Sequence, residues 1–365
     1  MKKIGILGGT FDPFHNQHLN IAKTAYQKLQ LDEVWILPTK QNPLKDSVSA
    51  TNEQRVAMIN LVINDYPWLK LNEYELTNSA PSYTINTVTY FTNTYCNYKF
   101  YFIIGSDNLY TLNQWQGIEQ LINLVKIVVV NRPHFRKTLD LMKKYQCRNL
   151  VVSPSSDISS AKIRNGEVIN QLDSRVNNYI NDNLLYNNTR LQFNLDEKRT
   201  QHCFNVGEMA RKLAIHYKIN PIHAQIAGNY HDLCKQWSKG KMTRYLTKYN
   251  KDILREPFPV WHGYVAALYL KNHYLVTNDS IINAIAKHTT GAIMMTELDL
   301  IVLLADKISI ERSSPHVEQL RTLAFKDLTL AFKFYLKTLK TYLESKNQPL
   351  NKKFLTIYEL WINKE

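Results

Sequence analysis

Cysteine is scarce in this sequence, and long apolar runs are absent from it. The chain has four cysteines in 365 residues and no Cys-x-x-Cys pair, so neither a disulfide framework nor a zinc-finger spacing is indicated. We therefore expect reduced thiols and a cytoplasmic protein. No stretch approaches the roughly 20 apolar residues that cross a bilayer. The N-terminal residues do not form a signal peptide, because Thr10 and Asp12 interrupt the apolar run and no small-residue cleavage site follows.

Acidic residues are also few compared with basic ones, at 31 Asp and Glu against 45 Lys and Arg, which gives a formal net charge of +14. Such a charge favours polyanionic partners, either nucleotides or nucleic acid. The basic residues are scattered and form no arginine-rich arm, so we interpret the charge first as surface composition and second as an attractive field for nucleotides. Nucleic-acid binding is the weakest alternative, because it rests on charge alone.

The remaining composition is that of a globular protein, with 44% hydrophobic and 11% aromatic residues. The length allows two domains, each with its own core. As far as about Tyr186, short apolar runs alternate with amphipathic stretches. This alternation predicts a parallel sheet with helical crossovers, whose ligands bind at the carboxyl ends of the strands. The expected strands are 4–7, 33–37, 100–104, 126–130 and 149–152, and the expected helices are 17–26, 52–64, 85–94, 114–124 and 136–144.

The pattern changes beyond Tyr186, where helical periodicity continues with almost no strand-like run. We place the boundary near residues 187–193 and expect two domains, residues 1–190 and 191–365. The predicted fold class is α/β followed by all-α. Expected helices in the second domain include 206–215, 223–229, 263–270 and 317–343.

A glycine turn follows the first expected strand. Gly8 and Gly9 permit positive φ and close backbone approach, so that N–H groups can point at phosphate oxygens. His15 and His18 are three residues apart at the start of the next helix and can face one bound polyphosphate. An imidazolium there would neutralise charge that develops on a transferring phosphoryl group.

The string Gly8-Gly9-Thr10-Phe11-Asp12-Pro13, followed by His15-Asn16-Gln17-His18, resembles the signature of the nucleotidylyltransferases. Gln17 stands where that family usually has glycine. The segment Ser159–Arg164 resembles the second phosphate motif of the family, with Ala161 in place of threonine. The resemblance implies a Rossmann-like domain in which His15, His18 and Arg164 are catalytic. It also implies phosphate contacts from Gly8, Gly9, Thr10, Phe11, Ser159 and Ser160.

Further motifs within residues 1–186 resemble the bacterial nicotinate mononucleotide adenylyltransferases, namely Pro81–Thr87, Gly105–Asn108 and Trp115. That resemblance implies adenylyl transfer from ATP, with Mg²⁺ on its triphosphate, to nicotinate mononucleotide, giving nicotinate adenine dinucleotide and pyrophosphate in NAD biosynthesis. It implies that Thr84, Thr87 and Trp115 face the nicotinate nucleotide, that Gly105 and Asp107 lie beside the adenosine, and that Lys45 and Arg132 lie near the phosphates. Structural roles stay open, with Trp115 in the core, Asp107 as a helix cap, Lys45 solvated and Arg132 in an ion pair. The alternative enzyme is another nucleotidylyltransferase, such as the pantetheine-phosphate type.

The second half contains a set of histidines and aspartates that suits metal binding. Imidazole and carboxylate are ligands of borderline divalent metals, and the adjacent pair His231-Asp232 would let one carboxylate bridge two ions. The expected metal ligands are His202, His231, Asp232, His262, His288 and Asp306.

This series resembles the HD superfamily of metal-dependent phosphohydrolases. Within it, four motifs resemble the bacterial symmetrical diadenosine tetraphosphate hydrolases, a family with a di-iron centre: Arg199–His202, His231–Lys235, His288–Gly291 and Ala305–Lys307. The resemblance implies hydrolysis of dinucleoside polyphosphates, a catalytic role for Asp232, and phosphate contacts from Lys235 and Arg312. The ligand set itself suits Fe, Mn, Co or Zn. The alternative is a nucleotide-sensing domain without turnover, and the sequence carries no signal for an oligomeric state.

Overall fold

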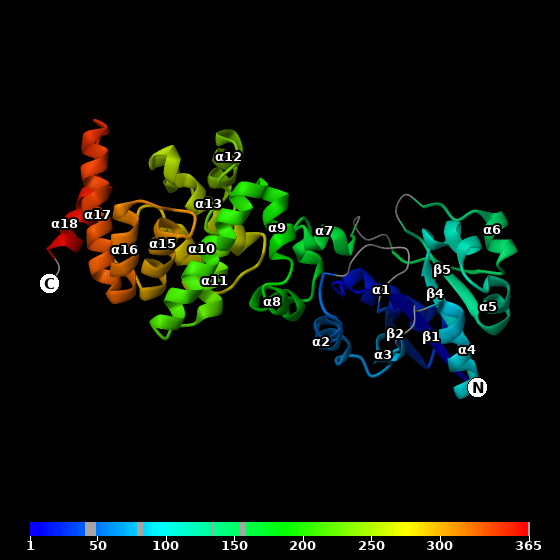
Figure 1. The fold of residues 1–365 in the computed structure, drawn as a ribbon. Coiled ribbons are helices and arrows are strands. Elements are labelled where there is room, and N and C mark those ends of the chain that lie inside the picture. The colour runs from blue at the N-terminus through cyan, green and yellow to red at the C-terminus, as the bar shows by residue number, and fades with distance from the viewer. Residues whose placement is uncertain (41–48, 79–82, 133–134, 154–157, 364–365) are drawn as a thin grey trace. The chain divides into compact units, whose positions relative to one another are not determined.

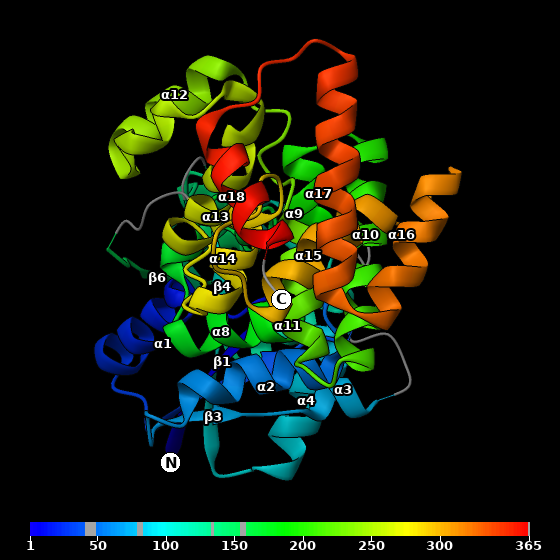
Figure 2. The same cartoon turned by 90° about the vertical axis from the view of Figure 1, so that its left-hand side faces the viewer.

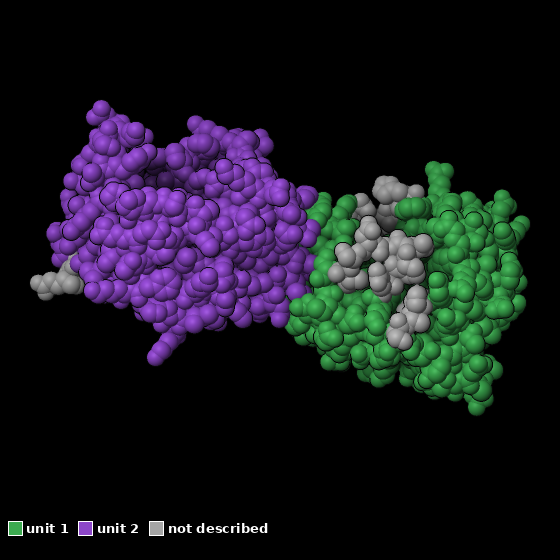
Figure 3. Space-filling model, viewed as in Figure 1, with its two compact units in different colours: residues 1–180 green, residues 181–365 purple. Residues whose placement is uncertain are grey.

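The computed structural model describes residues 1–40, 49–78, 83–132, 135–153 and 158–363. The chain divides into two compact units, Met1–Ile180 and Asn181–Glu365 (Figure 3). The second unit therefore starts before the region 187–193 where the sequence pattern changes. Its first residues already pack on its helices: Tyr230 donates a hydrogen bond to Asn187, and the Arg190 guanidinium lies 4.7 Å from the centre of the Tyr274 ring.

A parallel sheet forms the centre of the first unit, as the sequence predicts. Among the described residues it has six strands in the order β3-β2-β1-β4-β5-β6, and all neighbouring pairs are parallel (Figure 1). The strands are β1 (Lys2–Gly9), β2 (Glu33–Pro38), β3 (Leu69–Leu71), β4 (Tyr98–Gly105), β5 (Lys126–Val130) and β6 (Arg148–Leu150). Strands 1, 4 and 5 are apolar along most of their length because helices cover both faces of such a sheet.

The helices of this unit alternate with the strands. They are α1 (Asn16–Leu29), α2 (Asn52–Ile63), α3 (Tyr74–Thr77), α4 (Thr84–Thr94), α5 (Ile118–Leu124), α6 (Leu139–Lys144), α7 (Ser160–Arg164) and α8 (Ser174–Asp182), with 3₁₀ turns at Asn108–Gln114 and Ile169–Gln171. An aromatic contact in the core joins the sheet to a helix: the ring of Trp35 on β2 meets the ring of Phe91 on α4 edge to face, with centroids 5.3 Å apart. The reversal of strand order lies between β1 and β4, so the crevice at their carboxyl ends begins at Gly9 and Gly105.

The secondary structure of this unit differs in detail from the expectation, and the strand expected over 149–152 is found at Arg148–Leu150. Strand β3 was not predicted, because three residues with an exposed lysine in the middle give no clear alternation. The helix expected over 114–124 begins only at Ile118, since Gly117 has a φ of +65° and interrupts the helical path. The helix expected over 136–144 begins at Leu139.

All regular secondary structure in the described residues of the second unit is helical, as predicted. Its helices are α9 (Asn187–Asn194), α10 (Glu197–His216), α11 (Pro221–Tyr230), α12 (Lys239–Tyr249), α13 (Trp261–Asn272), α14 (Asp279–Lys287), α15 (Glu297–Ile308), α16 (Pro315–Lys326), α17 (Leu328–Ser345) and α18 (Lys352–Ile362), with 3₁₀ turns at Lys251–Arg255 and Phe258–Val260. Helix α10 packs against α11 and α15, and α17 packs against α15 and α16 (Figure 2). The single helix expected over 317–343 is two helices, because the Asp327 carboxylate caps the second by accepting the Leu330 N–H at 2.8 Å.

Candidate active sites

The glycine loop of the first unit is held by buried polar contacts. Gly8 and Gly9 are the last residues of β1, and the Asp12 carboxylate that follows accepts the N–H groups of Ser49 and Ala50 at 2.8 and 3.2 Å. The fully buried Arg55 donates to the carbonyl oxygens of Thr10 and Thr39 at 2.6 and 2.8 Å. This arginine ties the loop to the residue after β2. The sequence offered no signal for it, because its partners are backbone atoms distant in the chain.

The two histidines of the loop lie together at the start of α1. Their rings stack with centroids 3.6 Å apart, and the His15 N–H donates to Nδ1 of His18 at 3.2 Å. The ring of Phe11 is buried and meets His18 edge to face at 4.9 Å, so this side chain supports the histidine. Gln17 lies inside the first turn of α1, where the helix does not require glycine.

The protonation of His15 differs from the expected imidazolium. Burial, with a smaller contribution from the positive charge of Arg132, lowers the pKa of His15 to about 3. His15 is therefore neutral near pH 7 in this structure. A neutral imidazole in this position acts through hydrogen bonds, whereas the sequence had suggested charge neutralisation.

The second phosphate motif meets the first. Arg164 donates from Nη1 to the carbonyl oxygen of Asp12 at 2.8 Å, and Ser160 donates to the carbonyl oxygen of Pro13 at 3.3 Å. Ser159 caps α7 by accepting the Lys162 N–H at 3.2 Å. Two segments about 150 residues apart in the chain thus form one polar surface beside the glycine loop.

A third group lies at the ends of β4 and β5. Nε of Arg132 lies 3.3 Å from a carboxylate oxygen of Asp107, and the Arg132 N–H donates to the Ser106 hydroxyl at 2.9 Å. This pair passes directly over Gly105, because a Cβ there would lie 2.2 Å from the Asp107 oxygen and 2.6 Å from Nε of Arg132. Asp107 makes no side-chain cap on the turn that follows. Arg132 is in an ion pair and also lies close enough to His15 to influence its pKa.

The three residues expected to face the nicotinate nucleotide differ in their exposure to solvent. Thr84 begins α4 and is partly exposed, whereas Thr87 is buried and its hydroxyl donates to Glu75 at 2.8 Å. Burial raises the pKa of Glu75 to about 7. Trp115 is partly buried and meets Phe102 edge to face at 6.2 Å. Lys45 lies outside the described residues.

In the second unit, the structure brings all six expected metal ligands together. Residues from five helices or helix ends converge, and the ligand atoms form three overlapping groups within 4.8 Å. Two close glycine contacts bring their helices together: a Cβ on Gly228 of α11 would lie 2.6 Å from Cα of Gly207 on α10, and one on Gly263 of α13 would lie 3.0 Å from the His288 ring.

Each histidine of the cluster is oriented by a hydrogen bond through Nδ1. Three of these acceptors are carbonyl oxygens, at 2.6 Å for His231, 2.7 Å for His288 and 2.8 Å for His262. Nδ1 of His202 lies 2.5 Å from a carboxylate oxygen of Glu311. A carbonyl only accepts, so Nδ1 carries the proton and Nε2 presents its lone pair to the cluster.

The Nε2 atoms meet two buried carboxylates. One oxygen of Asp232 lies 3.1 and 3.6 Å from Nε2 of His262 and His288, and its other oxygen lies 3.6 and 4.0 Å from Nε2 of His231 and His202. Nε2 of His202 also lies 3.2 Å from Asp306. Nε2 of His202 and His231 have no hydrogen-bond partner despite burial. This arrangement of lone pairs and carboxylates fits the binding of divalent metal.

The electrostatics of three of the four histidines agree with neutral metal ligands, whereas hydrogen bonds to Asp306 and Glu311 raise the pKa of His202 despite its burial. Burial lowers the pKa of His231 to about 4 and lowers those of His262 and His288, so these rings are neutral ligands. Contacts with the surrounding histidines hold the pKa of Asp232 well below its usual range despite burial, and the charge of Lys307 together with the His202 hydrogen bond does the same for Asp306. Both carboxylates are therefore ionised.

Basic side chains surround the two carboxylates. Arg312 and Lys307 donate to Asp306 at 3.0 and 2.6 Å, and Arg199 donates to Asp232 at 2.9 Å. Nζ of Lys235 lies 3.2 Å from Nε2 of His262. The sequence predicted Lys235 and Arg312 near the site, included Arg199 and Lys307 in the motifs without giving them a role, and missed Glu311. Arg199 carried a usable signal, since it precedes His202 by three residues and so lies on the same face of α10.

None of the helices in the described ranges is long and apolar enough to cross a membrane.

Comparisons with known proteins match both units. Residues 6–166 match the cytidylyltransferase-like family, and residues 199–311 match the HD domain. A probable nicotinate-nucleotide adenylyltransferase/Ap4A hydrolase from Mycoplasma genitalium is 36% identical over 345 residues, covering 93% of this chain and 97% of the relative. Its counterpart in Mycoplasma pneumoniae is 33% identical over 345 residues, covering 92% and 98%. A solved HD superfamily hydrolase involved in NAD metabolism from Clostridium acetobutylicum is 27% identical, with a TM-score of 0.46, covering 49% of this chain and 96% of its own.

Proposed function

The chain belongs to the family of nicotinate-nucleotide adenylyltransferase/Ap4A hydrolases, and from that premise we propose two separate phosphate reactions, one in each unit. We assign one functional domain to each compact unit, Met1–Ile180 and Asn181–Glu365. Both reactions use nucleotides, which supports a location in the cytoplasm.

The first reaction is adenylyl transfer from ATP to nicotinate mononucleotide. A phosphate oxygen of the mononucleotide bonds to the α-phosphorus of ATP, the bond from that phosphorus to the β-phosphate bridge breaks, and pyrophosphate leaves. The junction of the two phosphate motifs, where Arg164 meets Asp12, carries this proposal. Mg²⁺ accompanies the triphosphate of ATP as part of the substrate.

The residues of the first unit then have distinct roles. Backbone N–H groups of Gly8 to Phe11 approach phosphate oxygens, and the stacked pair His15 and His18 donates hydrogen bonds to the transferring phosphate. Arg164 supplies positive charge from the opposite side of the loop, with Ser159 and Ser160 beside it. Gly105, Asp107 and Arg132 line the adenosine side, and Thr84, Thr87 and Trp115 the nicotinate side. Lys45 is proposed as a further phosphate contact.

A comparison of three phosphate acceptors, each supplied separately, tests this assignment. The full chain is incubated with ATP, Mg²⁺ and either nicotinate mononucleotide, nicotinamide mononucleotide or phosphopantetheine, and pyrophosphate release is followed. We expect the highest kcat/KM with nicotinate mononucleotide and a large loss of turnover in His18→Ala with the fold intact. A preference for phosphopantetheine, or near-normal turnover of His18→Ala, contradicts the proposal.

The second reaction is metal-dependent hydrolysis of diadenosine tetraphosphate. The convergence of four histidine Nε2 atoms on Asp232 and Asp306 carries this proposal. His202, His231, Asp232, His262, His288 and Asp306 would hold two metal ions, which we propose to be iron. When bound, these ions supply the Lewis acidity that activates water.

This chain's own residues then position the polyphosphate. One carboxylate oxygen of Asp232 faces His262 and His288, and the other faces His231 and His202. This side chain therefore fixes the two pairs of histidines relative to each other. Lys235 and Arg312 bind phosphate oxygens next to the cluster. Water oxygen bonds to one central phosphorus, the central P–O–P bridge breaks, and two ADP molecules form.

Metal analysis and a product assay test the second reaction. Protein purified without oxygen is analysed for transition metals, then supplied with diadenosine tetraphosphate and Fe²⁺ or Mn²⁺. We expect about two ions per chain and ADP as the product. A chain that binds the nucleotide without cleaving it would favour the nucleotide-sensing alternative.

A further inference from the structure

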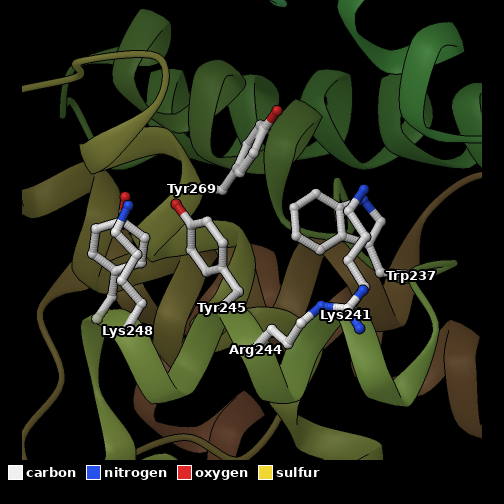
Figure 4. Close-up of a pocket in the computed structure, with 7 residues that line it drawn as sticks. Trp237, Lys241, Arg244, Tyr245, Lys248 and Tyr269 are labelled. Atoms are coloured by element: carbon white, nitrogen blue, oxygen red, sulfur yellow. The ribbon is translucent and has the colours of Figure 1, made fainter.

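A second feature of the helical unit is a cavity of about 380 Å³ between α12 and α13 (Figure 4). A nucleoside fits such a volume, because small-molecule sites occupy about 300 to 1,000 Å³. None of the residues around it is a proposed metal ligand. The lining includes Trp237, Lys241, Arg244, Tyr245, Lys248 and Tyr269.

Aromatic rings form much of this cavity. The Trp237 ring meets Tyr269 at 5.1 Å and Tyr245 at 5.8 Å, in both cases edge to face. The Tyr245 hydroxyl donates to the carbonyl oxygen of Leu268 on α13 at 3.4 Å, which holds its ring in place. Trp237 is buried, while Tyr245 and Tyr269 are partly exposed. The ring of Tyr269 stacks on His273 at 4.3 Å and that of Tyr245 lies 4.6 Å from Tyr249, so a planar ligand would extend an existing group of rings.

The charged side chains of the cavity have one sign. Lys241, Arg244 and Lys248 are spaced by three and four residues, so they lie on one face of α12 together with Tyr245. Nζ of Lys241 lies 3.5 Å from the centre of the Trp237 ring. Helix α12 contains four basic residues and no acidic one. Aromatic surface beside several cations is a combination that recognises a base with attached phosphates.

The cavity is connected to the metal cluster through two segments. Tyr269 follows His262 by seven residues on α13, which places it on the same face of the helix and about 10 Å further along the axis. Trp237 follows Asp232 by five residues, and Lys235 between them contacts His262. A nucleotide with its phosphates at the cluster would have to span this distance for its base to reach the aromatic rings.

We propose that this cavity binds the base and adjoining phosphate at one end of the dinucleoside polyphosphate. This assignment rests on the proposed hydrolysis reaction in the same unit. The tyrosine rings stack on the base, and Arg244 and Lys248 neutralise phosphate charge at the exposed rim.

Steady-state kinetics of the metal-loaded full chain test the assignment. Arg244→Gln/Lys248→Gln removes two exposed cations, and the fold should persist because Lys248 contacts the ring of Tyr249, which is itself exposed. We expect KM for diadenosine tetraphosphate to rise about tenfold with kcat and metal content retained. The matched control is Lys239→Gln/Lys251→Gln, which removes the same charge from exposed positions beside the cavity and should leave KM unchanged. Equal KM values in the two double variants overturn the assignment.

Product inhibition tests the stacking separately. Tyr245→Leu should weaken inhibition by ADP about fivefold or more while leaving inhibition by pyrophosphate, which has no base, unchanged. An equal loss for both inhibitors, or for neither, overturns the base contact. A wild-type chain that does not cleave diadenosine tetraphosphate refutes the hydrolysis reaction itself, whereas cleavage with unaltered cavity variants refutes only the subsite.

Discussion

Arg164 donates a hydrogen bond of 2.8 Å to the backbone carbonyl oxygen of Asp12, 152 residues earlier in the chain. Its guanidinium also lies 3.9 Å from the Asp12 carboxylate, which is itself held by two backbone N–H groups of the segment before α2. One side chain thus links the two phosphate motifs and keeps a positive charge next to the glycine loop. The first prediction follows from this link.

Arg164→Lys should lower kcat of adenylyl transfer about 10- to 100-fold. Lysine keeps the charge, but it offers one compact ammonium where arginine has a fork of donors, and a hydrogen bond to a charged group is worth about 1.5 to 3 kcal/mol. Pyrophosphate release measures the loss. Hydrolysis of diadenosine tetraphosphate by the same preparation is the internal control, and a parallel loss of both activities would indicate a general folding defect.

His15 should make the stability of the chain depend on pH. Its pKa is about 3 in the fold and near 6.5 when unfolded, so the unfolded chain binds the additional proton between these values. The stabilisation is fully present above pH 6.5 and is lost as the pH falls toward 3, by about 2 kcal/mol at pH 5. Denaturant unfolding at pH 7.5 and pH 5 measures the difference. His15→Asn should reduce it by about that amount, and an unchanged difference would show that His15 is not buried as described.

Gly105→Ala should impair adenylyl transfer selectively. The added Cβ would lie 2.2 Å from the Asp107 carboxylate and 2.6 Å from Nε of Arg132, so this pair must move away from the end of β4. We expect KM for ATP to rise about tenfold or more, with hydrolysis unaffected. Gly240→Ala is a matched control, because its Cβ would meet nothing closer than an Arg244 nitrogen at 4.0 Å. Equal KM values for the two variants would place the adenosine elsewhere.

Sequence patterns predicted the parts of this fold whose signal is local. The sequence predicted the apolar strands β1, β4 and β5 and the helices beyond α9. Burial on both faces of a strand gives a continuous apolar run, and burial on one face of a helix gives apolar residues at helical spacing. The break at Asp327 was missed because the residues on both sides continue the same apolar periodicity. Strand β3 was missed because its pairing with β2 creates the strand, and three residues alone do not.

The metal-binding site of the second unit, like the fold, was predicted where its signal in the sequence is local. Motif order and spacing predicted six candidate metal ligands, and the structure brings their ligand atoms together. The residues that orient these side chains were not predicted where the two partners are distant in the chain. Glu311 contacts His202 across 109 residues, and Arg55 holds the glycine loop through backbone oxygens. Such contacts leave no periodicity or spacing in the sequence.

Glu311→Gln should weaken metal binding without removing a metal ligand. The carboxylate orients His202 through Nδ1 and increases the basicity of Nε2, and loss of such a partner typically costs 10- to 100-fold in metal affinity. Metal affinity is measured by competition with a chromogenic chelator. Glu208→Gln, which removes an exposed carboxylate from α10 that pairs with Arg211, should leave the affinity unchanged. Equal affinities of the two variants would show that Glu311 has no orienting role.

Metal removal should separate the two reactions. Two buried carboxylates and four imidazole nitrogens converge in the second unit, and metal binding to the folded form alone stabilises it by about 2.7 kcal/mol at a free concentration 100 times Kd. Arg199, Lys307 and Arg312 already compensate the carboxylates, so the unit should stay folded without metal but melt at a lower temperature. After dialysis against a chelator, we expect no hydrolysis, a lower Tm for one of two thermal transitions, and full adenylyl transfer once Mg²⁺ and ATP are supplied. Fe²⁺ or Mn²⁺ should restore both hydrolysis and Tm. The buried Nε2 atoms of His202 and His231 have no hydrogen-bond partner, which is why we expect them to bind metal. If chelation changes neither Tm nor hydrolysis, the cluster is not a metal centre.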